Sequence, residues 1–256
     1  MKFLSICLVL IATAASAHSQ RSANHAAASR RASTATTRLM STQSKDAEQR
    51  LAELGYWTGP VDGRFDAASQ SALIAFQKYE GRTITGKLTA DEVEAIRNAK
   101  PVQPREQGYA HVEVDVDRQV LLIVNSEGSV RVLPTSTGSG KEYLDDGETS
   151  VAYTPRGRFL VYNKFDGWEE GRFGSAYYAS FISGSVAIHG YPTVPTQPAS
   201  HGCIRIPIFA AREVSKLMPL GTIVLVYDKV SFVSAKPWAD DPQRKKAALY
   251  WHRIVD

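Results

Sequence analysis

Two short segments near the C-terminal end of the 256-residue chain carry the side chains best suited to chemistry. One contains His189, and the other contains His201 and Cys203. A thiol is a poor nucleophile until it loses its proton, and a nearby imidazole can take that proton or hold the thiolate as an ion pair. These residue types therefore predict covalent catalysis by Cys203. His189 ends an apolar strand that would hold it rigidly, whereas His201 is nearer in sequence, so adjacency alone leaves the choice of base open.

A glycine beside the cysteine bears on how an intermediate would be stabilised. Gly202 allows a tight turn immediately before Cys203. The backbone N–H groups of Gly202 and Cys203 are then expected to point at the oxyanion that develops during acyl transfer.

A zinc site is the main alternative use of these side chains. His189, His201 and Cys203 are ligand types that zinc accepts. A catalytic zinc also needs an activated water and an acid/base partner, and the sequence offers no convincing second cluster. We therefore expect neither a metal nor another cofactor. In a third interpretation Cys203 is a buried small hydrophobe and both histidines are structural, which does not explain a lone exported cysteine between a glycine and a basic residue.

The first residues predict export. Lys2 is followed by an apolar stretch from Phe3 to Ala12 and by the small-residue cleavage site Ala15-Ser16-Ala17, which is the pattern of a secretory signal peptide. The apolar stretch is shorter than the roughly 20 residues needed to cross a bilayer. Residues 1–17 are therefore interpreted as a cleaved signal peptide, with no stable membrane insertion afterwards. We expect the mature protein in the periplasm or the cell wall.

Cleavage after residue 17 leaves one cysteine. The sequence has two, and Cys7 lies within the signal peptide. A single thiol cannot form an intrachain disulfide in an oxidising compartment. Cys203 is therefore expected to be exported as a free thiol, which favours a chemical role.

The charge of the chain is a weak guide to its partners. The formal net charge is +4, which favours anionic surroundings such as wall material. Nucleic acid would fit the same charge, but the sequence has no basic stripe interleaved with aromatic residues and no helix-turn-helix or zinc-finger spacing. We expect no nucleic-acid partner.

The N-terminal half of the mature chain predicts a tether and a small helical domain. Residues 18–45 are rich in alanine, serine and arginine and have almost no large apolar side chains, so a disordered linker is expected. Residues 46–98 show three short amphipathic segments, the second capped by Asp66 and the third by Thr89 in a capping box with Glu92. These patterns predict a three-helix domain. Residues 99–108, which include two prolines, are interpreted as an interdomain linker.

The periodicity changes from helical to alternating after residue 108. One helix is expected over residues 207–218. The predicted strands are 111–117, 120–124, 130–133, 158–162, 181–188 and 222–227. Residues 109–228 therefore form a mainly β domain with a mixed sheet or sandwich. Residues 229–256 are left as a C-terminal tail.

Each of these two domains resembles a known protein family. The segments Ile188-His189-Gly190 and Ser200-His201-Gly202-Cys203-Ile204-Arg205 strongly resemble the L,D-transpeptidase (YkuD-type) catalytic domain, with support from residues 154–159 and 221–222. The string LGYWTGPVDGRFDAASQSALIAFQ resembles the peptidoglycan-binding module of wall enzymes, although Asp66 stands where that family commonly has glycine. The resemblance implies a mixed β-sandwich with a short helix, preceded by a three-helix domain.

The catalytic resemblance also implies roles for individual residues. It makes Cys203 the nucleophile and His189 the general base, with the Gly190 carbonyl orienting the imidazole and Gly202 contributing to the oxyanion hole. The side chains implied to shape the site and hold the stem peptide are Ser200, His201 and Arg205. Arg205 stands at a position that is asparagine in part of the family.

The reaction implied by the resemblance is acyl transfer on peptidoglycan stem peptides during cell-wall biogenesis. Cys203 forms a thioester with the donor stem and releases its terminal D-alanine. The acyl group then passes to an amine on a second stem or on a wall-anchored protein. Water as the acceptor would make the protein a carboxypeptidase, and a free D-amino acid would give exchange. A non-catalytic wall-binding protein and a metal-dependent peptidase remain as alternatives.

Overall fold

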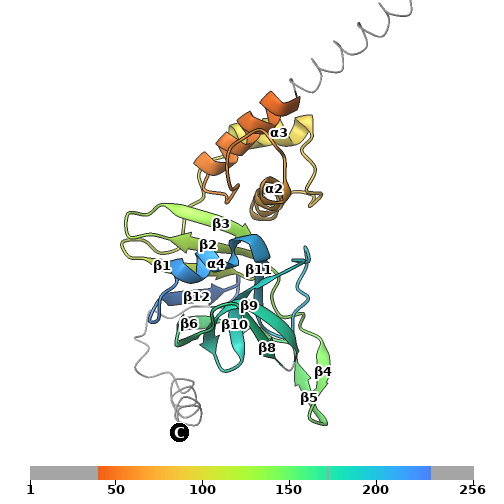
Figure 1. Cartoon of the computed structure of the whole chain (residues 1–256), viewed down its shortest axis with the longest axis vertical. Coiled ribbons are helices and arrows are strands. Elements are labelled where there is room, and N and C mark those ends of the chain that lie inside the picture. The colour runs from red at the N-terminus through yellow and green to blue at the C-terminus, as the bar shows by residue number, and fades with distance from the viewer. Residues whose placement is uncertain (1–39, 172, 232–256) are drawn as a thin grey trace, which may run out of the picture.

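The computed structural model describes residues 40–171 and 173–231. The predicted signal peptide, most of the predicted N-terminal linker and nearly all of the predicted tail lie outside these residues. The helices of the N-terminal part lie above the β domain along the long axis of the molecule (Figure 1). No helix in the described residues is long and apolar enough to cross a membrane.

The N-terminal part, which we call the helical module, spans residues 40–98. It contains a helix over residues 40–53, α2 (Ala67–Tyr79) and α3 (Ala90–Asn98). The Asp66 carboxylate caps α2, and the Thr89 hydroxyl caps α3 by accepting from the Glu92 N–H. The Glu92 carboxylate instead pairs with Arg82 at 3.1 Å, so only half of the expected capping box forms. Residues 40–45, expected in the disordered linker, are helical.

The first sheet has the strand order β3-β2-β1-β12-β6. β1 pairs in parallel with β12, and the other neighbours are antiparallel, so the sheet is mixed. Its strands are β1 (His111–Asp115), β2 (Val120–Val124), β3 (Val130–Pro134), β6 (Gly157–Leu160) and β12 (Ile223–Tyr227). Every residue of β1 and β2 is buried. This sheet is therefore covered on both faces.

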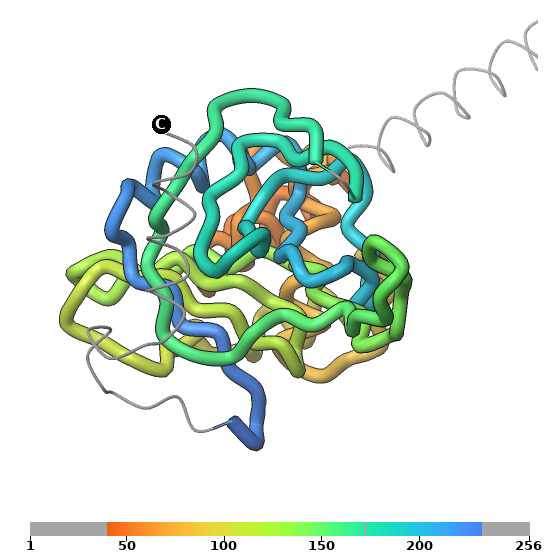
Figure 2. Tube along the Cα trace, turned by 90° about the horizontal axis from the view of Figure 1, so that it is seen from below, coloured from red at the N-terminus to blue at the C-terminus, as the bar shows by residue number. Residues whose placement is uncertain are grey.

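The helical module covers one of these faces. Side chains of β2 and β3 join a hydrophobic core with side chains of the three helices, including Val120, Leu122, Leu51, Leu73 and Phe76. Burial of such side chains typically stabilises a fold by about 1.5–3 kcal/mol each. The module and the β domain therefore share a core rather than joining only through a linker. Seen along the long axis, the module lies behind the sheets (Figure 2).

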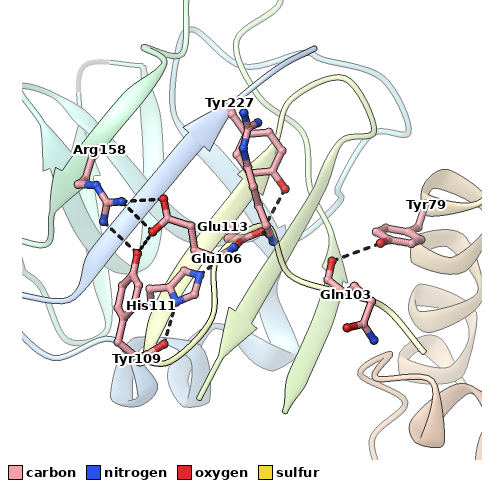
Figure 3. Close-up of polar contacts among 9 residues, drawn as sticks. Tyr79, Gln103, Glu106, Tyr109, His111, Glu113, Arg158 and Tyr227 are labelled. Atoms are coloured by element: carbon pink, nitrogen blue, oxygen red, sulfur yellow. Dashed lines mark hydrogen bonds and ion pairs between the residues drawn. The ribbon is translucent and has the colours of Figure 1, made fainter. Parts of the chain in front are cut away.

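The segment predicted as an interdomain linker, residues 99–108, is packed in place. Val102 is buried in the shared core, and its N–H donates to the Leu54 carbonyl at 3.1 Å. The N–H groups of Arg105 and Glu106 each donate to the Glu113 carboxylate at 2.9 Å. These contacts fasten the segment along β1 in a polar cluster that also holds Arg158, Tyr109 and His111 (Figure 3).

The second sheet carries the strands that matter for function. Its main path is β11-β10-β9-β7, with β8 paired to β9. Its strands are β7 (Asn163–Lys164), β8 (Trp168–Gly171), β9 (Gly174–Ser183), β10 (Val186–Tyr191) and β11 (Ile204–Pro207). The predicted single strand over residues 181–188 is wrong, because a turn at Gly184 divides it into the β9–β10 hairpin. A separate hairpin, β4 (Glu142–Asp145) and β5 (Glu148–Val151), was not predicted.

The helix α4 (Ile208–Leu217), close to the predicted 207–218, packs on the second sheet and joins the core between the sheets. It passes so close to β10 that a Cβ on Gly190 would lie 2.5 Å from the Cβ of Ala211. Glycine at this position is therefore required by packing. Because strand side chains alternate, the faces of β10 and β11 turned away from this core are free to form a site.

Candidate active site

Two neighbouring parallel strands bring the predicted residues together. In the β10–β11 register His189 lies opposite Arg205, and Ile188 lies opposite Ile204. Ile188 and Ile204 belong to the core, so His189 and Arg205 point to the other face. Cys203 immediately precedes β11 and has the same parity as Arg205. The fold therefore places the thiol, the imidazole and the guanidinium on one face.

These side chains line a cleft of about 380 Å³. Its walls come from the β4–β5 hairpin, the β8–β9 hairpin, β10 and residues 200–205. The predicted site residues on its lining are His189, Ser200, His201, Gly202, Cys203 and Arg205. Gly190 contributes its backbone carbonyl behind this lining.

His189 is a buried imidazole with one ring nitrogen hydrogen-bonded to the backbone. Its side chain is 5% exposed, and Nδ1 lies 3.0 Å from the Gly190 carbonyl oxygen. A carbonyl can only accept, so Nδ1 carries the proton and Nε2 has the free lone pair. Burial lowers the pKa of His189, the Gly190 carbonyl opposes this, and the charge of Arg205 lowers it further, with a net lowering. The imidazole is therefore neutral near pH 7.

Cys203 is held as a thiol. It is half-buried, and its Sγ donates to the Ser185 carbonyl at 3.5 Å. Burial raises the pKa of Cys203, and this outweighs the opposing effects of the Ala187 backbone and the Arg205 charge. The resting site therefore holds a neutral thiol and a neutral imidazole rather than a preformed thiolate–imidazolium pair. Such a pair suits general-base activation of the thiol during attack.

The loop before Cys203 is closed by its own hydrogen bonds. The Gly202 N–H donates to the Ser200 hydroxyl at 3.0 Å, and that hydroxyl donates to the Cys203 carbonyl. The Thr154 hydroxyl donates to the Gly202 carbonyl at 2.7 Å. Gly202 has φ +144°, and a Cβ there would lie 2.9 Å from the Tyr153 carbonyl oxygen.

These bonds involve two residues with expected roles in the site. The Gly202 N–H is directed at the Ser200 hydroxyl. Ser200 is 2% exposed, and its hydroxyl donates within the loop and helps to shape it. The sequence pattern alone could not show the direction of the Gly202 N–H, because the same glycine conformation would also allow it to point at a developing oxyanion.

The Arg205 side chain is held beside Cys203 and His189. Its guanidinium lies over the ring of Tyr191, 4.2 Å from the centroid, and Nη1 donates to the Ala199 carbonyl at 3.4 Å. A cation stacked on an aromatic ring keeps a defined direction. The side chain supplies the positive charge that lowers the pKa values of His189 and Cys203.

His201 forms part of an aromatic rim. Its ring stacks on Phe173 with centroids 4.8 Å apart and meets Tyr143 edge-on at 4.8 Å. Sequence reasoning missed both partners. The Asp146-Gly147 dipeptide is a frequent hairpin turn signal and could have located the hairpin that carries Tyr143.

Comparisons with known proteins agree with this architecture. The YkuD family model, described as the L,D-transpeptidase catalytic domain, matches residues 109–226. The structure of the L,D-transpeptidase of Xylanimonas cellulosilytica is 37% identical, with a TM-score of 0.67 over 72% of this chain and 92% of that one. The chain belongs to the L,D-transpeptidase family. The PG_binding_1 model of peptidoglycan-binding domains matches residues 41–96 of this L,D-transpeptidase.

Membership of the L,D-transpeptidase family confirms the resemblance and the fold class expected from the sequence. A second structure, the L,D-transpeptidase of Stackebrandtia nassauensis, is 19% identical, with a TM-score of 0.43 over 72% of this chain and 90% of that one. A search of curated proteins gave no match. L,D-transpeptidases act on peptidoglycan, which places their activity outside the cytoplasm.

The zinc alternative required His189, His201 and Cys203 as joint ligands. Within the part of the chain that the structure describes, no group of three or more histidine, cysteine or acidic side chains is placed to hold a metal ion. The rings of Phe173 and Tyr143 instead surround His201 in this L,D-transpeptidase.

Proposed function

We propose that this L,D-transpeptidase joins peptidoglycan stem peptides through a Cys203 thioester, with His189 as the general base. One observation carries the proposal. The neutral imidazole of His189, fixed through Nδ1 by the Gly190 carbonyl, shares a cleft and a sheet face with the Cys203 thiol. The charge of Arg205 beside both groups favours removal of the thiol proton.

In the acylation step, Nε2 of His189 accepts the Cys203 proton as Sγ attacks the carbonyl of the third stem residue. The amide bond to the terminal D-alanine breaks, and the departing amine takes the proton back from the imidazolium. The Gly190 carbonyl at Nδ1 stabilises the transient positive charge on the ring and replaces the acid of other triads. We assign the oxyanion to the Cys203 N–H, because the Gly202 N–H is used within the loop.

In the second step an amine that has lost its extra proton to solvent attacks the thioester. His189 accepts a proton from the attacking nitrogen and passes it to the sulfur of Cys203, which leaves as a thiol. The acceptor that we favour is the side-chain amine of a second stem. Asp145 and Glu169 also line the cleft, and carboxylates there favour an acceptor that arrives as an ammonium group. A wall-anchored protein is an alternative acceptor, and water would give an L,D-carboxypeptidase.

The remaining proposals concern substrate contacts and location. The Arg205 guanidinium suits recognition of a stem carboxylate, and His201 would contact the stem at the cleft rim. The helical module would bring the enzyme to its polymer. With residues 1–17 as a signal peptide, we place the mature enzyme in the periplasm or the cell wall.

The decisive experiment is mass spectrometry of the products made from disaccharide-tetrapeptide by the mature protein and by Cys203→Ala. We expect a crosslinked dimer that has lost one D-alanine, and none from the variant. Tripeptide alone would show a carboxypeptidase. The absence of any Cys203-dependent product, with both proteins folded by circular dichroism, would contradict the proposal.

A further inference from the structure

Lys78, in the last turn of α2, has an unusually buried side-chain amine. Its residue is 5% exposed, and Nζ donates to the backbone carbonyls of Thr135 at 2.8 Å and Gln119 at 3.2 Å. Burial lowers the pKa of Lys78 to about 7. A buried ammonium is costly unless polar partners compensate for lost water. The helical module therefore places a costly group against the β domain at one defined point.

The two carbonyls lie on neighbouring segments, because Thr135 follows β3 and its N–H donates to the Gln119 carbonyl at 2.9 Å. The turn of residues 116–119, which leads into β2, ends at Gln119. This residue has φ +56°, which a non-glycine residue adopts rarely. Its side-chain amide donates to the Val116 carbonyl at 2.6 Å and to the Thr137 hydroxyl at 2.7 Å, and its amide oxygen accepts from the Thr137 N–H at 2.9 Å. Lys78 thus donates hydrogen bonds to two segments, Gln119 and residues 135–137, that are also hydrogen-bonded to each other.

Residues 135–139, which we call the brace, bond in turn to the backbone around Cys203. The Thr135 hydroxyl donates to the Arg205 carbonyl at 2.7 Å, and Ser136 exchanges two backbone hydrogen bonds with Arg205. The N–H groups of Ala199 and Ser200 both donate to the Thr137 carbonyl at 3.0 Å. Residues 135, 136 and 137 are all 0% exposed. The brace therefore supports residues 199–205, the loop with the nucleophile, on both sides of Cys203.

We infer that Lys78 is a positioning residue for the nucleophile: through the Thr135 and Gln119 carbonyls it fixes the brace, and the brace fixes the loop around Cys203. The helical module then contributes to the geometry of the active site in addition to any contact with the wall. This inference rests on the proposed function for its effect on turnover. Its effect on the Cys203 thiol does not depend on the natural substrate.

The test compares Lys78→Met, which keeps length but loses the donors, with Lys78→Arg, which keeps donors. Leu51→Ala is the matched control, because it weakens the shared core and removes neither hydrogen bond of Lys78. All proteins are studied well below their unfolding temperatures. The measurements are kcat and KM for transpeptidation and the rate at which iodoacetamide alkylates Cys203 at pH 7.

We expect Lys78→Met to lower kcat by about 10- to 100-fold, because small misplacements of reacting groups have effects of this size, with KM within about two-fold. Alkylation should become several-fold faster, because a looser loop reduces the burial that raises the pKa of the thiol. Lys78→Arg should recover part of kcat. Leu51→Ala should lower the unfolding temperature while leaving kcat and alkylation close to wild type.

Wild-type kcat and alkylation in folded Lys78→Met would overturn the inference, as would an equal loss of kcat in Leu51→Ala. If Lys78→Met does not fold, Thr135→Val replaces it, because that change removes only the hydroxyl bond to the Arg205 carbonyl. The same fall in kcat and the same faster alkylation are then expected. If the wild type makes no product but alkylation still responds to Lys78→Met alone, the proposed function fails and the positioning role stands.

Discussion

Two buried histidines in this molecule have opposite surroundings. His111 on β1 lies 3.0 Å from the Glu113 carboxylate through Nε2 and 2.9 Å from the Tyr109 carbonyl through Nδ1. His189 on β10 has the Gly190 carbonyl at Nδ1 and the Arg205 charge nearby. Both side chains are almost fully buried. The difference between the two sites lies in their charged neighbours.

The charged neighbours decide how each imidazole titrates. Burial by itself lowers the pKa of His111, but the bonds to Glu113 and Tyr109 and the charges of Glu113 and Glu106 outweigh it, so the pKa is raised. The pKa of His189 is lowered by burial and by Arg205. A carboxylate partner thus makes a structural ion pair, whereas a carbonyl partner leaves a neutral ring that can accept a proton. In the mechanism that we propose, His189 therefore needs no acidic third residue.

Removal of the imidazole should therefore lower activity at position 189 and stability at position 111. His189→Ala is expected to lower kcat by about 10²- to 10⁴-fold, the usual contribution of a general base, with little change in the free energy of unfolding. Transpeptidation kinetics and urea unfolding measured on one preparation check this. A His189→Ala enzyme with near wild-type kcat would show that another group deprotonates Cys203.

Removal of the other imidazole should act on stability. His111→Ala leaves the buried Glu113 with fewer partners, and breaking such a pair costs about 3 kcal/mol. Urea unfolding should show this loss, whereas kcat should stay within about two-fold of wild type because the polar cluster of Figure 3 lies outside the catalytic cleft. A large fall in kcat without loss of stability would mean that the two regions are coupled.

A third change probes the charge beside the catalytic pair. Arg205→Met removes the cation that lowers the pKa of Cys203, so the pH at which iodoacetamide alkylation is half-maximal should move upward. In the wild type that midpoint is expected above the ordinary thiol range, because burial dominates. Alkylation rates between pH 6 and 10 measure both values. A wild-type midpoint below pH 7 would instead indicate a thiolate–imidazolium pair.

Features that depend on short stretches of sequence could be predicted from the sequence alone. The caps at Asp66 and Thr89 are set by hydrogen bonds within one turn, so the sequence alone could locate them. Residue types identified Cys203 as a candidate nucleophile and left two histidines as candidate bases, and only the family resemblance favoured His189. The β10–β11 register places His189 beside Arg205. The apolar run from Val120 to Val124 predicted a strand, and β2 has the same bounds.

Features that depend on distant contacts were not predictable in this way. The same run from Val120 to Val124 could not reveal that the helical module covers it. Nor could the sequence show that Ser200 would occupy the Gly202 N–H, or that Glu113 would fasten the linker. Each of these depends on which chain segment fills a space or meets a polar group after folding.

The smallest expected effect is the part of the pH dependence of stability that His111 contributes. Its folded pKa is raised, so its stabilisation is complete below the unfolded value of about 6.5 and is lost as pH rises through the folded pKa. Lys78 has a folded pKa lowered to about 7, so its contribution makes the free energy of unfolding rise with pH above that value. This contribution is the same in wild type and in His111→Gln, so it cancels when the two proteins are compared. The stability gap between these two proteins in urea should therefore narrow, by about 1 kcal/mol or less, between pH 6 and 9. A constant gap would show that His111 does not carry a proton in the folded protein, and the contrast with His189 would then be one of packing rather than charge.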